Sequence, residues 1–180
     1  MPFDITQLLA DHRGRNSALH AEHINPVFAN VLQTIGFDRC YERAQGQYYW
    51  DVEGIEYLDM LSGYGVFNIG RNHPTVGNAI QEFLASEHPS LVQMEAPLLS
   101  GVLAQQLKAK VGSHLERVYF TNTGAEGIET AIKFARRATG RAKIVYLQKA
   151  FHGLTNGALA INGDEFFGKD LRSFCPTVAR

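Results

Sequence analysis

Apolar residues recur at helical spacing in several stretches of the chain, and residues that helices avoid bound each stretch. The pattern predicts a short helix near the N-terminus and a second short helix ending at Gly36, with Asn25-Pro26 interrupting the apolar spacing between them. Three longer amphipathic helices are predicted further along, and a glycine follows each of the last two. They cover about residues 74–84, 97–111 and 125–138.

A second kind of pattern, rich in aromatic and β-branched residues, predicts strands. Residues from Gln47 to Asp59 alternate in character around a Glu53-Gly54 turn, which is typical of a β-hairpin. The runs Arg117–Thr121 and Lys143–Gln148 are typical of buried strands, and a predicted helix lies between them. Strand, helix and strand in this order form a βαβ unit, so the sequence predicts a parallel sheet with a right-handed crossover.

The turn Asn122-Thr123-Gly124 joins the first of these strands to its helix. The start of a helix presents unpaired backbone N–H groups and the positive end of the helix dipole, which together suit a phosphate. Thr123 and Glu126 also have the spacing of a capping box, in which both side chains bond to backbone N–H groups of the first turn. The turn by itself is compatible with either role.

Two other segments are candidates for a functional role. The loop Lys149–Gly153 follows the second predicted strand, and ligands of parallel sheets gather at this edge. It offers the ring of Phe151 and the imidazole of His152. The glycine-rich segment Ser62–Pro74 indicates a backbone that turns sharply or approaches another group closely, although a plain connector fits it equally well.

Composition excludes several classes of protein. A hydrophobic fraction of 45% over 180 residues is ample for a core, and a net charge of −1 with scattered basic residues disfavours a nucleic-acid or polybasic membrane surface. No apolar run approaches the ~20 residues of a membrane span, and the N-terminus lacks the order of regions found in signal peptides. Cys40 and Cys175 have no metal or redox spacing, which favours reduced thiols in a cytoplasmic protein. His20-x-x-His23 lacks further ligands, so no metal site is predicted.

Several segments occur in an order that is typical of one known family. They are Tyr49–Gly54, Tyr57–Asp59, Gly70–Pro74, Phe120–Glu126, Ala131–Arg136, Thr139–Arg141 and Phe151–Gly153. These segments resemble the class III aminotransferases, fold type I enzymes that depend on pyridoxal phosphate and include the acetylornithine, ornithine, 4-aminobutyrate and putrescine transaminases. The resemblance runs from about Gly46 to the end of the chain.

The resemblance implies an α/β fold of the fold type I transferases. Residues 1–74 would then be an N-terminal segment with a β-hairpin that contributes to the small domain. Residues 75–180 would form the first part of the large domain with its parallel or mixed sheet, which would be incomplete. The family also implies a cytoplasmic homodimer that acts on a small-molecule amino donor and a 2-oxo acid, with no nucleic-acid or membrane partner.

The resemblance also implies roles for individual residues. Thr123, Gly124 and Ala125 match the phosphate-binding turn, although the family more often has serine at the first of these positions. Phe151 matches the aromatic residue that stacks on the pyridine ring, and His152 shapes the same loop or contacts the cofactor. Tyr64 matches a segment that lines the substrate pocket, where it would contact substrate or else pack as a core tyrosine, which is the safer interpretation. The family often has histidine where Arg71 stands, and the sequence does not explain this difference.

Two expected groups have no match in the chain: the Schiff-base lysine and the aspartate that pairs with the pyridine nitrogen. None of the lysines has the expected context; they are Lys108, Lys110, Lys133, Lys143, Lys149 and Lys169. We therefore expect the chain to be the amino-terminal part of such an enzyme and to be inactive alone. The predicted reaction of the whole enzyme is transamination of an amino acid, diamine or ω-amino acid with a 2-oxo acid. The alternatives are another chemistry of the same family (an aminomutase, decarboxylating transaminase or racemase) or a non-catalytic fragment or pseudoenzyme.

Overall fold

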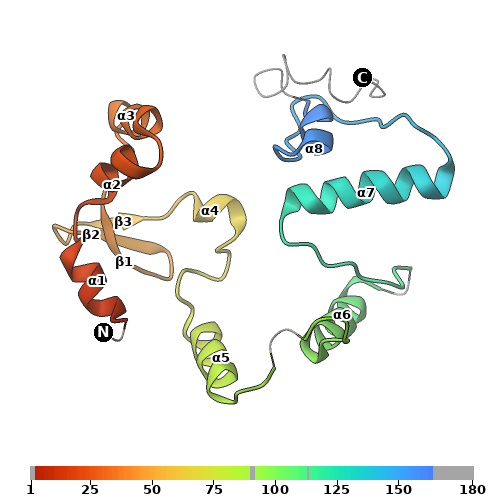
Figure 1. Ribbon diagram of the computed structural model, residues 1–180, viewed down its shortest axis with the longest axis horizontal. Helices are drawn as coiled ribbons and strands as arrows, with labels where there is room; N and C mark the ends of the chain where they lie inside the picture. The colour runs from red at the N-terminus through yellow and green to blue at the C-terminus, as the bar shows by residue number, and fades with distance from the viewer. Residues whose placement is uncertain (1–2, 90–91, 113, 164–180) are drawn as a thin grey trace. The chain divides into compact units, whose positions relative to one another are not determined.

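The computed structural model describes residues 3–89, 92–112 and 114–163, so Lys169 and Cys175 lie outside the described residues. The chain divides into two compact units, residues 1–90 and residues 91–180, and each is described by itself (Figure 1). The first unit contains α1 (Ile5–Asp11), α2 (Asn16–His23), α3 (Pro26–Thr34), β1 (Tyr41–Gln45), β2 (Tyr48–Asp51), β3 (Glu56–Leu58), α4 (Ser62–Gly65) and α5 (Pro74–Ala85). The second contains α6 (Leu98–Val111), α7 (Gly124–Thr139) and α8 (Asn156–Ala160).

Side-chain caps determine where helices α1 and α3 of the first unit begin. The Asp4 carboxylate accepts hydrogen bonds from two N–H groups at the start of α1, and Asn25 accepts one from Phe28 N–H at the start of α3. Pro26 occupies the first turn of α3, where its missing N–H costs nothing. The predicted helix before Gly36 is confirmed as α3. Helix α2 was not predicted, because its sequence NSALHAEH carries no apolar stripe.

The predicted hairpin is confirmed as β2 and β3, which pair antiparallel with Tyr49 opposite Tyr57. Asp51 closes the turn: its buried carboxylate accepts hydrogen bonds from Glu53 N–H (3.0 Å), Ile55 N–H (2.9 Å) and the Tyr57 hydroxyl (2.8 Å). The third strand, β1, pairs antiparallel with the other side of β2. It was not predicted, since its sequence YERAQ is largely polar and its exposed face needs no apolar residues.

The glycine-rich segment makes both the sharp turn and the close approach that its sequence predicted. All four residues of α4 have positive φ angles, between 49° and 88°, so the short helix is left-handed. Further along, Gly70 packs against Gly46, and a side chain there would lie 2.8 Å from the Gly46 Cα. A two-way backbone bridge between Gly46 and Arg71 holds the segment against the hairpin.

The helices predicted in residues 74–84, 97–111 and 125–138 are confirmed as α5, α6 and α7. Gly112 and Gly140 follow the last two, and Gly140 adopts the left-handed conformation (φ 69°) that ends many helices. Helix α8 lies beside α7 (Figure 1) and was not predicted. None of the residues of α5, α6 and α7 is buried, so their apolar stripes are largely uncovered in the described residues.

The two predicted strands of the βαβ unit were wrong for this structure. Residues 117–121 form no strand, and residues 143–148 contain only one isolated bridge position, Ile144. A strand requires a neighbour that takes up its backbone hydrogen bonds, and no described segment pairs with either run as a ladder. The helix between them forms because its hydrogen bonds are internal. Among the described residues no helix is long and apolar enough to cross a membrane.

Candidate functional site

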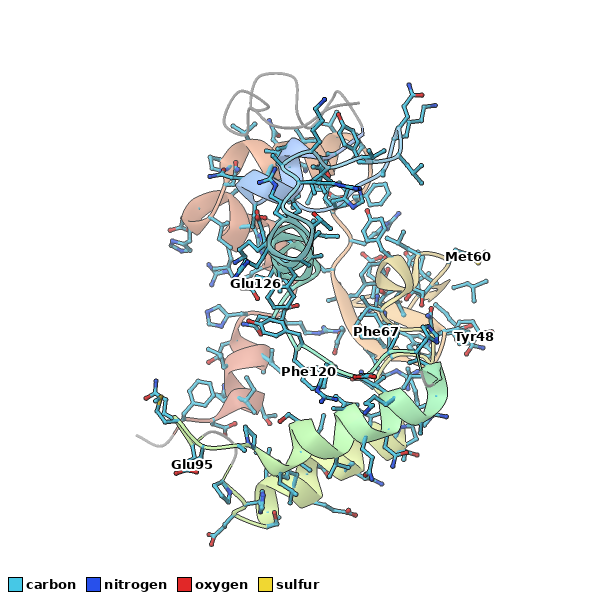
Figure 2. All side chains as sticks on the ribbon, turned by 90° about the vertical axis from the view of Figure 1, so that its right-hand side faces the viewer. Tyr48, Met60, Phe67, Glu95, Phe120 and Glu126 are labelled. Atoms are coloured by element: carbon cyan, nitrogen blue, oxygen red, sulfur yellow. The ribbon has the colours of Figure 1, made fainter. Side chains whose placement is uncertain are left out.

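The start of α7 is fixed by its own capping residues. Thr123 has an extended backbone, and its hydroxyl oxygen accepts a hydrogen bond from Glu126 N–H at 3.1 Å. The return bond differs from the predicted capping box: the Glu126 carboxylate accepts from Asn122 N–H (2.8 Å) and not from Thr123. Glu126 lies at the helix start, and Phe120 lies in the segment that leads to it (Figure 2). The capping role of Thr123 and Glu126 is thus real, with the carboxylate bonded one residue earlier.

Capping leaves other donors for a ligand. The first N–H groups of a helix have no intrahelical acceptor, so those of Gly124 and Ala125 remain available after Glu126 N–H is capped. Among the described residues, a Cβ added at Gly124 would meet no atom within 4 Å other than its chain neighbours and the backbone of α7, so the space beside it is open. Helix dipole, donors and open space are the conditions that an anion such as a phosphate requires.

The structure brings the Phe151–Gly153 loop directly against this turn. Gly153 is buried with φ 126°, and a Cβ built there would lie 2.6 Å from the Ala125 Cβ and 3.0 Å from its Cα. Only a glycine lets the two backbones come this close without a shift. The meeting of these two loops, which the sequence predicted from a shared sheet edge, therefore occurs through direct packing.

The loop presents two further predicted residues. Phe151 is 60% exposed, so its ring has a face that a ligand can reach. His152 is half-buried, and its Nε2 atom is buried with no hydrogen-bond partner among the described residues. A buried unpaired nitrogen is costly, and a polar ligand group at this position would relieve that cost. The residues present thus fit a cofactor that carries both a phosphate and an aromatic ring.

The carboxylate of Glu129, which was not predicted as a functional group, ties the start of α8 to α7. Glu129 Oε1 accepts hydrogen bonds from the Thr155 hydroxyl (2.7 Å), Gly157 N–H (2.7 Å) and Ala158 N–H (3.2 Å). Glu129 thereby caps the start of α8 from the side of α7. Burial acts to raise the pKa of Glu129, but these hydrogen bonds outweigh it and hold the pKa below its ordinary value.

This shift predicts a pH dependence of stability. Because the folded-state pKa lies below the unfolded value of about 4.3, the stabilisation is fully present above that pH and is lost as the pH falls through the folded-state pKa. Glu129→Gln is expected to lower the free energy of unfolding by about 1–2 kcal/mol at pH 7, with a difference that shrinks in acid. Thermal unfolding from pH 7 to 3 checks this, with the exposed Glu116→Gln as control. A difference that stays constant down to pH 3 would contradict the ionised cap.

The structure gives Arg71 a role. Its guanidinium lies 4.0 Å from the centre of the Phe67 ring and 4.5 Å from that of Tyr49, and its Nε donates to Asp59 Oδ2 at 2.9 Å. The other oxygen of Asp59 accepts from Ser62 N–H at 2.8 Å. Burial acts to raise the pKa of Asp59, but the bonds from Ser62 and Arg71 outweigh it and lower the pKa. Arg71 therefore fastens the glycine-rich segment to the hairpin through charge and two aromatic faces.

Tyr64 belongs to the first unit, whereas the other predicted site residues belong to the second. It lies in the left-handed turn of α4 with φ 56°, and it is 90% exposed. The interpretation of Tyr64 as a core residue is therefore wrong, because this turn projects it into solvent. Its contact with substrate stays a prediction.

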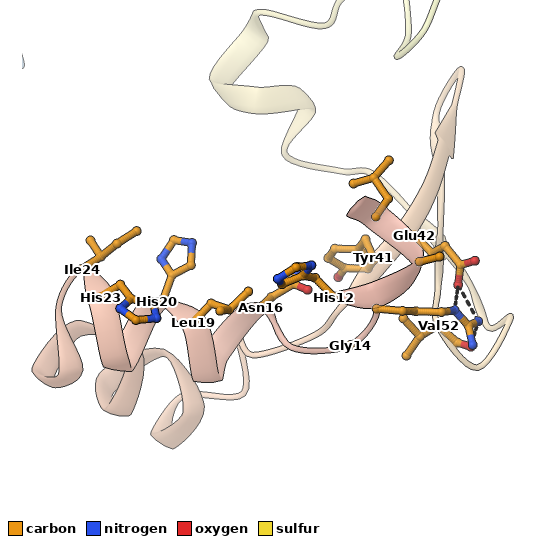
Figure 3. A pocket seen from close by; sticks show the side chains of 13 residues that line it. His12, Gly14, Asn16, Leu19, His20, His23, Ile24, Tyr41, Glu42 and Val52 are labelled. Carbon is orange, nitrogen blue, oxygen red and sulfur yellow. Dashed lines mark hydrogen bonds and ion pairs between the residues drawn. The ribbon is translucent and has the colours of Figure 1, made fainter. Parts of the chain in front are cut away.

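Two cavities of the described residues have walls that contain none of Tyr64, Thr123, Gly124, Ala125, Phe151 and His152. A cavity of about 750 Å³ lies in the first unit between α1, α2 and the sheet, and the ion pair of Arg13 with Glu42 lies at its wall (Figure 3). None of the predicted site residues lines it. Another, of about 520 Å³, adjoins the first turns of α7, and its wall carries the carboxylates of Glu126 and Glu129 together with Lys133. No group of metal-binding side chains occurs within residues 3–89, 92–112 and 114–163.

Comparison with known proteins identifies similar chains. The sequence model of the family described as Aminotransferase class-III matches residues 31–180. The chain is 34% identical over 178 residues to the aminotransferase PigE of a Serratia species, and 40% identical over 142 residues to an acetylornithine aminotransferase of Archaeoglobus fulgidus. These matches cover 97% and 78% of the chain. A taurine:2-oxoglutarate aminotransferase from Bifidobacterium kashiwanohense, solved with PLP and glutamate, superposes on 78% of the chain with a TM-score of 0.70 and 35% identity.

The chain spans only part of each of these proteins. It covers 20% of the length of the Serratia protein, 37% of the Archaeoglobus enzyme and 32% of the Bifidobacterium chain. The structural match extends to an adenosylmethionine-8-amino-7-oxononanoate aminotransferase of Methanocaldococcus jannaschii, with a TM-score of 0.74 over 90% of the chain at 25% identity. The fold type I class of the described segment is therefore confirmed, while the predicted boundary near residue 74 stays a prediction.

Proposed function

Because this chain belongs to the class III aminotransferases, we propose that it supplies the pyridoxal phosphate site of an enzyme that transfers amino groups. The packing of Gly153 on Ala125 carries the proposal, since it brings the phosphate-binding turn and the Phe151 loop together. The N–H groups of Gly124 and Ala125 bind the phosphate, and Phe151 stacks on the pyridine ring.

The residues have separate tasks. When bound, the cofactor supplies an electron sink for the carbon that exchanges its amino group. The start of α7 neutralises the phosphate charge, and the Thr123 hydroxyl keeps its proton for donation because its oxygen is the capping acceptor. Phe151 would stack on the ring and exclude water from one of its faces. His152 offers Nε2, which has no protein partner in the described residues, to the cofactor.

The proposed substrates are given only as chemical classes. The reaction is transamination between an amino acid, diamine or ω-amino acid and a 2-oxo acid, as the names of the similar enzymes suggest. Tyr64 lines the substrate pocket, and the working enzyme is a cytoplasmic homodimer. We assign the catalytic lysine to none of the described lysines, whose side chains are all exposed; they are Lys108, Lys110, Lys133, Lys143 and Lys149. A lysine that reacts with a carbonyl needs a desolvated setting that lowers its pKa.

Titration of the full-length protein with pyridoxal phosphate, followed by visible absorbance, tests the proposal. Binding is expected, and addition of an amino donor followed by a 2-oxo acid should change and then restore the spectrum. No saturable binding, or binding with no response to any amino donor, would overturn it. Phe151→Ala is expected to weaken binding by several-fold, because stacking of aromatic rings is worth about 1 kcal/mol. Phe151→Tyr should bind like the unmutated protein; equal losses in both variants would instead indicate that the ring packs in a core.

A further inference from the structure

We propose that Asn162 is a positioning residue, which fixes Phe151 at the cofactor by holding the backbone of the two residues that follow it. The inference rests on the proposed function. Asn162 lies after α8 and is fully buried at 0% exposure. A fully buried amide side chain is unusual unless both of its polar ends are bonded.

Both ends of the amide bond to the Phe151–Gly153 loop. Asn162 Oδ1 accepts from His152 N–H at 2.6 Å, and Asn162 Nδ2 donates to the Gly153 carbonyl oxygen at 3.0 Å. The two partners fix the orientation of the amide, since an N–H needs the oxygen and a carbonyl needs the nitrogen. One side chain thus holds the donor of one loop residue and the acceptor of the next.

The next residue in the chain holds the other side of Phe151. Gly163 N–H donates to the Ala150 carbonyl oxygen at 2.9 Å. A Cβ at Gly163 would lie within 3 Å of the backbone nitrogens of Lys149 and Ala150, so this approach is open only to glycine. Ala150 and His152 are therefore both held by adjacent residues, and Phe151 is the residue between them. The same loop is pressed on Ala125 through Gly153, so its position also sets the distance to the phosphate-binding turn.

The assignment predicts a measurable coupling between Asn162 and Phe151. In the full-length protein, Asn162→Ala should weaken pyridoxal phosphate binding about tenfold, since it removes two hydrogen bonds and leaves the buried His152 N–H unpaired. In a Phe151→Ala background the same change should cost about twofold or less, because the ring that it positions is already absent. Equal losses in the two backgrounds would overturn the inference.

A second variant separates positioning from simple loss of folding. Asn162→Asp keeps the acceptor for His152 N–H, and when protonated it also donates to the Gly153 carbonyl. Burial raises the pKa of such a carboxyl, so its affinity relative to the unmutated protein should recover as the pH falls from about 8 to about 5.5. If the ratio of the two affinities does not change with pH, the inference is overturned. This variant provides the test if Asn162→Ala does not fold.

The control is Asn156→Ala, at the exposed first position of α8, which should bind the cofactor like the unmutated protein. A melting temperature recorded for every variant separates stability from affinity. If Asn162→Ala lowers only the melting temperature, Asn162 is structural and the inference fails alone. If the unmutated protein binds no pyridoxal phosphate, the proposed function fails and the inference falls with it.

Discussion

Replacing Gly153 by alanine is expected to weaken pyridoxal phosphate binding by about a hundredfold, which corresponds to about 3 kcal/mol. Two effects act in the same direction. The φ angle of 126° is one that residues with a side chain rarely adopt. The added methyl group would also lie 2.6 Å from the Ala125 Cβ, so the loop must move away from the start of α7. The melting temperature should fall as well.

A double variant shows whether the contact itself is responsible. Ala125→Gly removes the Cβ that the new methyl group would meet, and it should restore part of the affinity of Gly153→Ala. The Ala125 Cα, at 3.0 Å, and the unfavourable φ angle remain, so recovery should be incomplete. Gly101→Ala on α6, where a Cβ would meet nothing within 4 Å, should leave affinity unchanged. Full affinity in a folded Gly153→Ala protein would show that the two loops need not touch for the cofactor to bind.

Gly124→Val should weaken pyridoxal phosphate binding about as strongly, but for the opposite structural reason. Apart from its chain neighbours and the backbone of α7, no atom of the described residues lies within 4 Å of a Cβ at this position, so the variant should fold. The branched side chain would instead occupy the open space beside the N–H groups of Gly124 and Ala125. Affinity should then fall about a hundredfold, as two or three bonds to a charged phosphate are lost.

Absorbance titration together with thermal unfolding checks this second prediction. Gly101→Val is the matched control, because it places the same β-branched side chain at an open position of another helix. It should cost some stability and no affinity. A folded Gly124→Val protein that binds the cofactor normally would leave the turn with only its capping role.

What the sequence predicted correctly depended on local chemistry. The cap at Thr123, the end of α7 at Gly140 and the hairpin turn at Glu53-Gly54 each follow from residues within a few positions of one another. The strands at residues 117–121 and 143–148 failed because pairing is a property of two segments, and an apolar run does not reveal whether its neighbour is in place. Even local prediction was inexact at Glu126. Its spacing predicted a bond to Thr123 N–H, yet its carboxylate accepts from Asn122 N–H.

In the candidate site, too, the sequence predicted some residues and missed others. Gly124, Ala125, Phe151 and His152 were predicted as cofactor-binding residues from their order in family motifs, whereas the groups that hold them were not predicted. Glu129 lies on a helix face, where a carboxylate is normally solvated, and Asn162 follows an apolar run with no motif around it. Their bonds join residues 9 to 29 positions apart, and no periodicity in the sequence reports contacts of that kind. A polar residue directly after the apolar run ALAI is the one signal that could have drawn attention to Asn162.

The left-handed turn of α4 limits which residues can stand at position 64. Tyr64 has a φ angle of 56°, in a region that costs an ordinary residue about 1 kcal/mol or more and costs glycine or asparagine little. If Tyr64 lines the substrate pocket as proposed, each substitution at position 64 alters two quantities together, the shape offered to the substrate and the strain in the backbone. Variants chosen for stability alone would drift from tyrosine towards glycine or asparagine and lose the ring. A tyrosine that is kept at this position despite the strain is expected to be kept because its side chain contributes to activity.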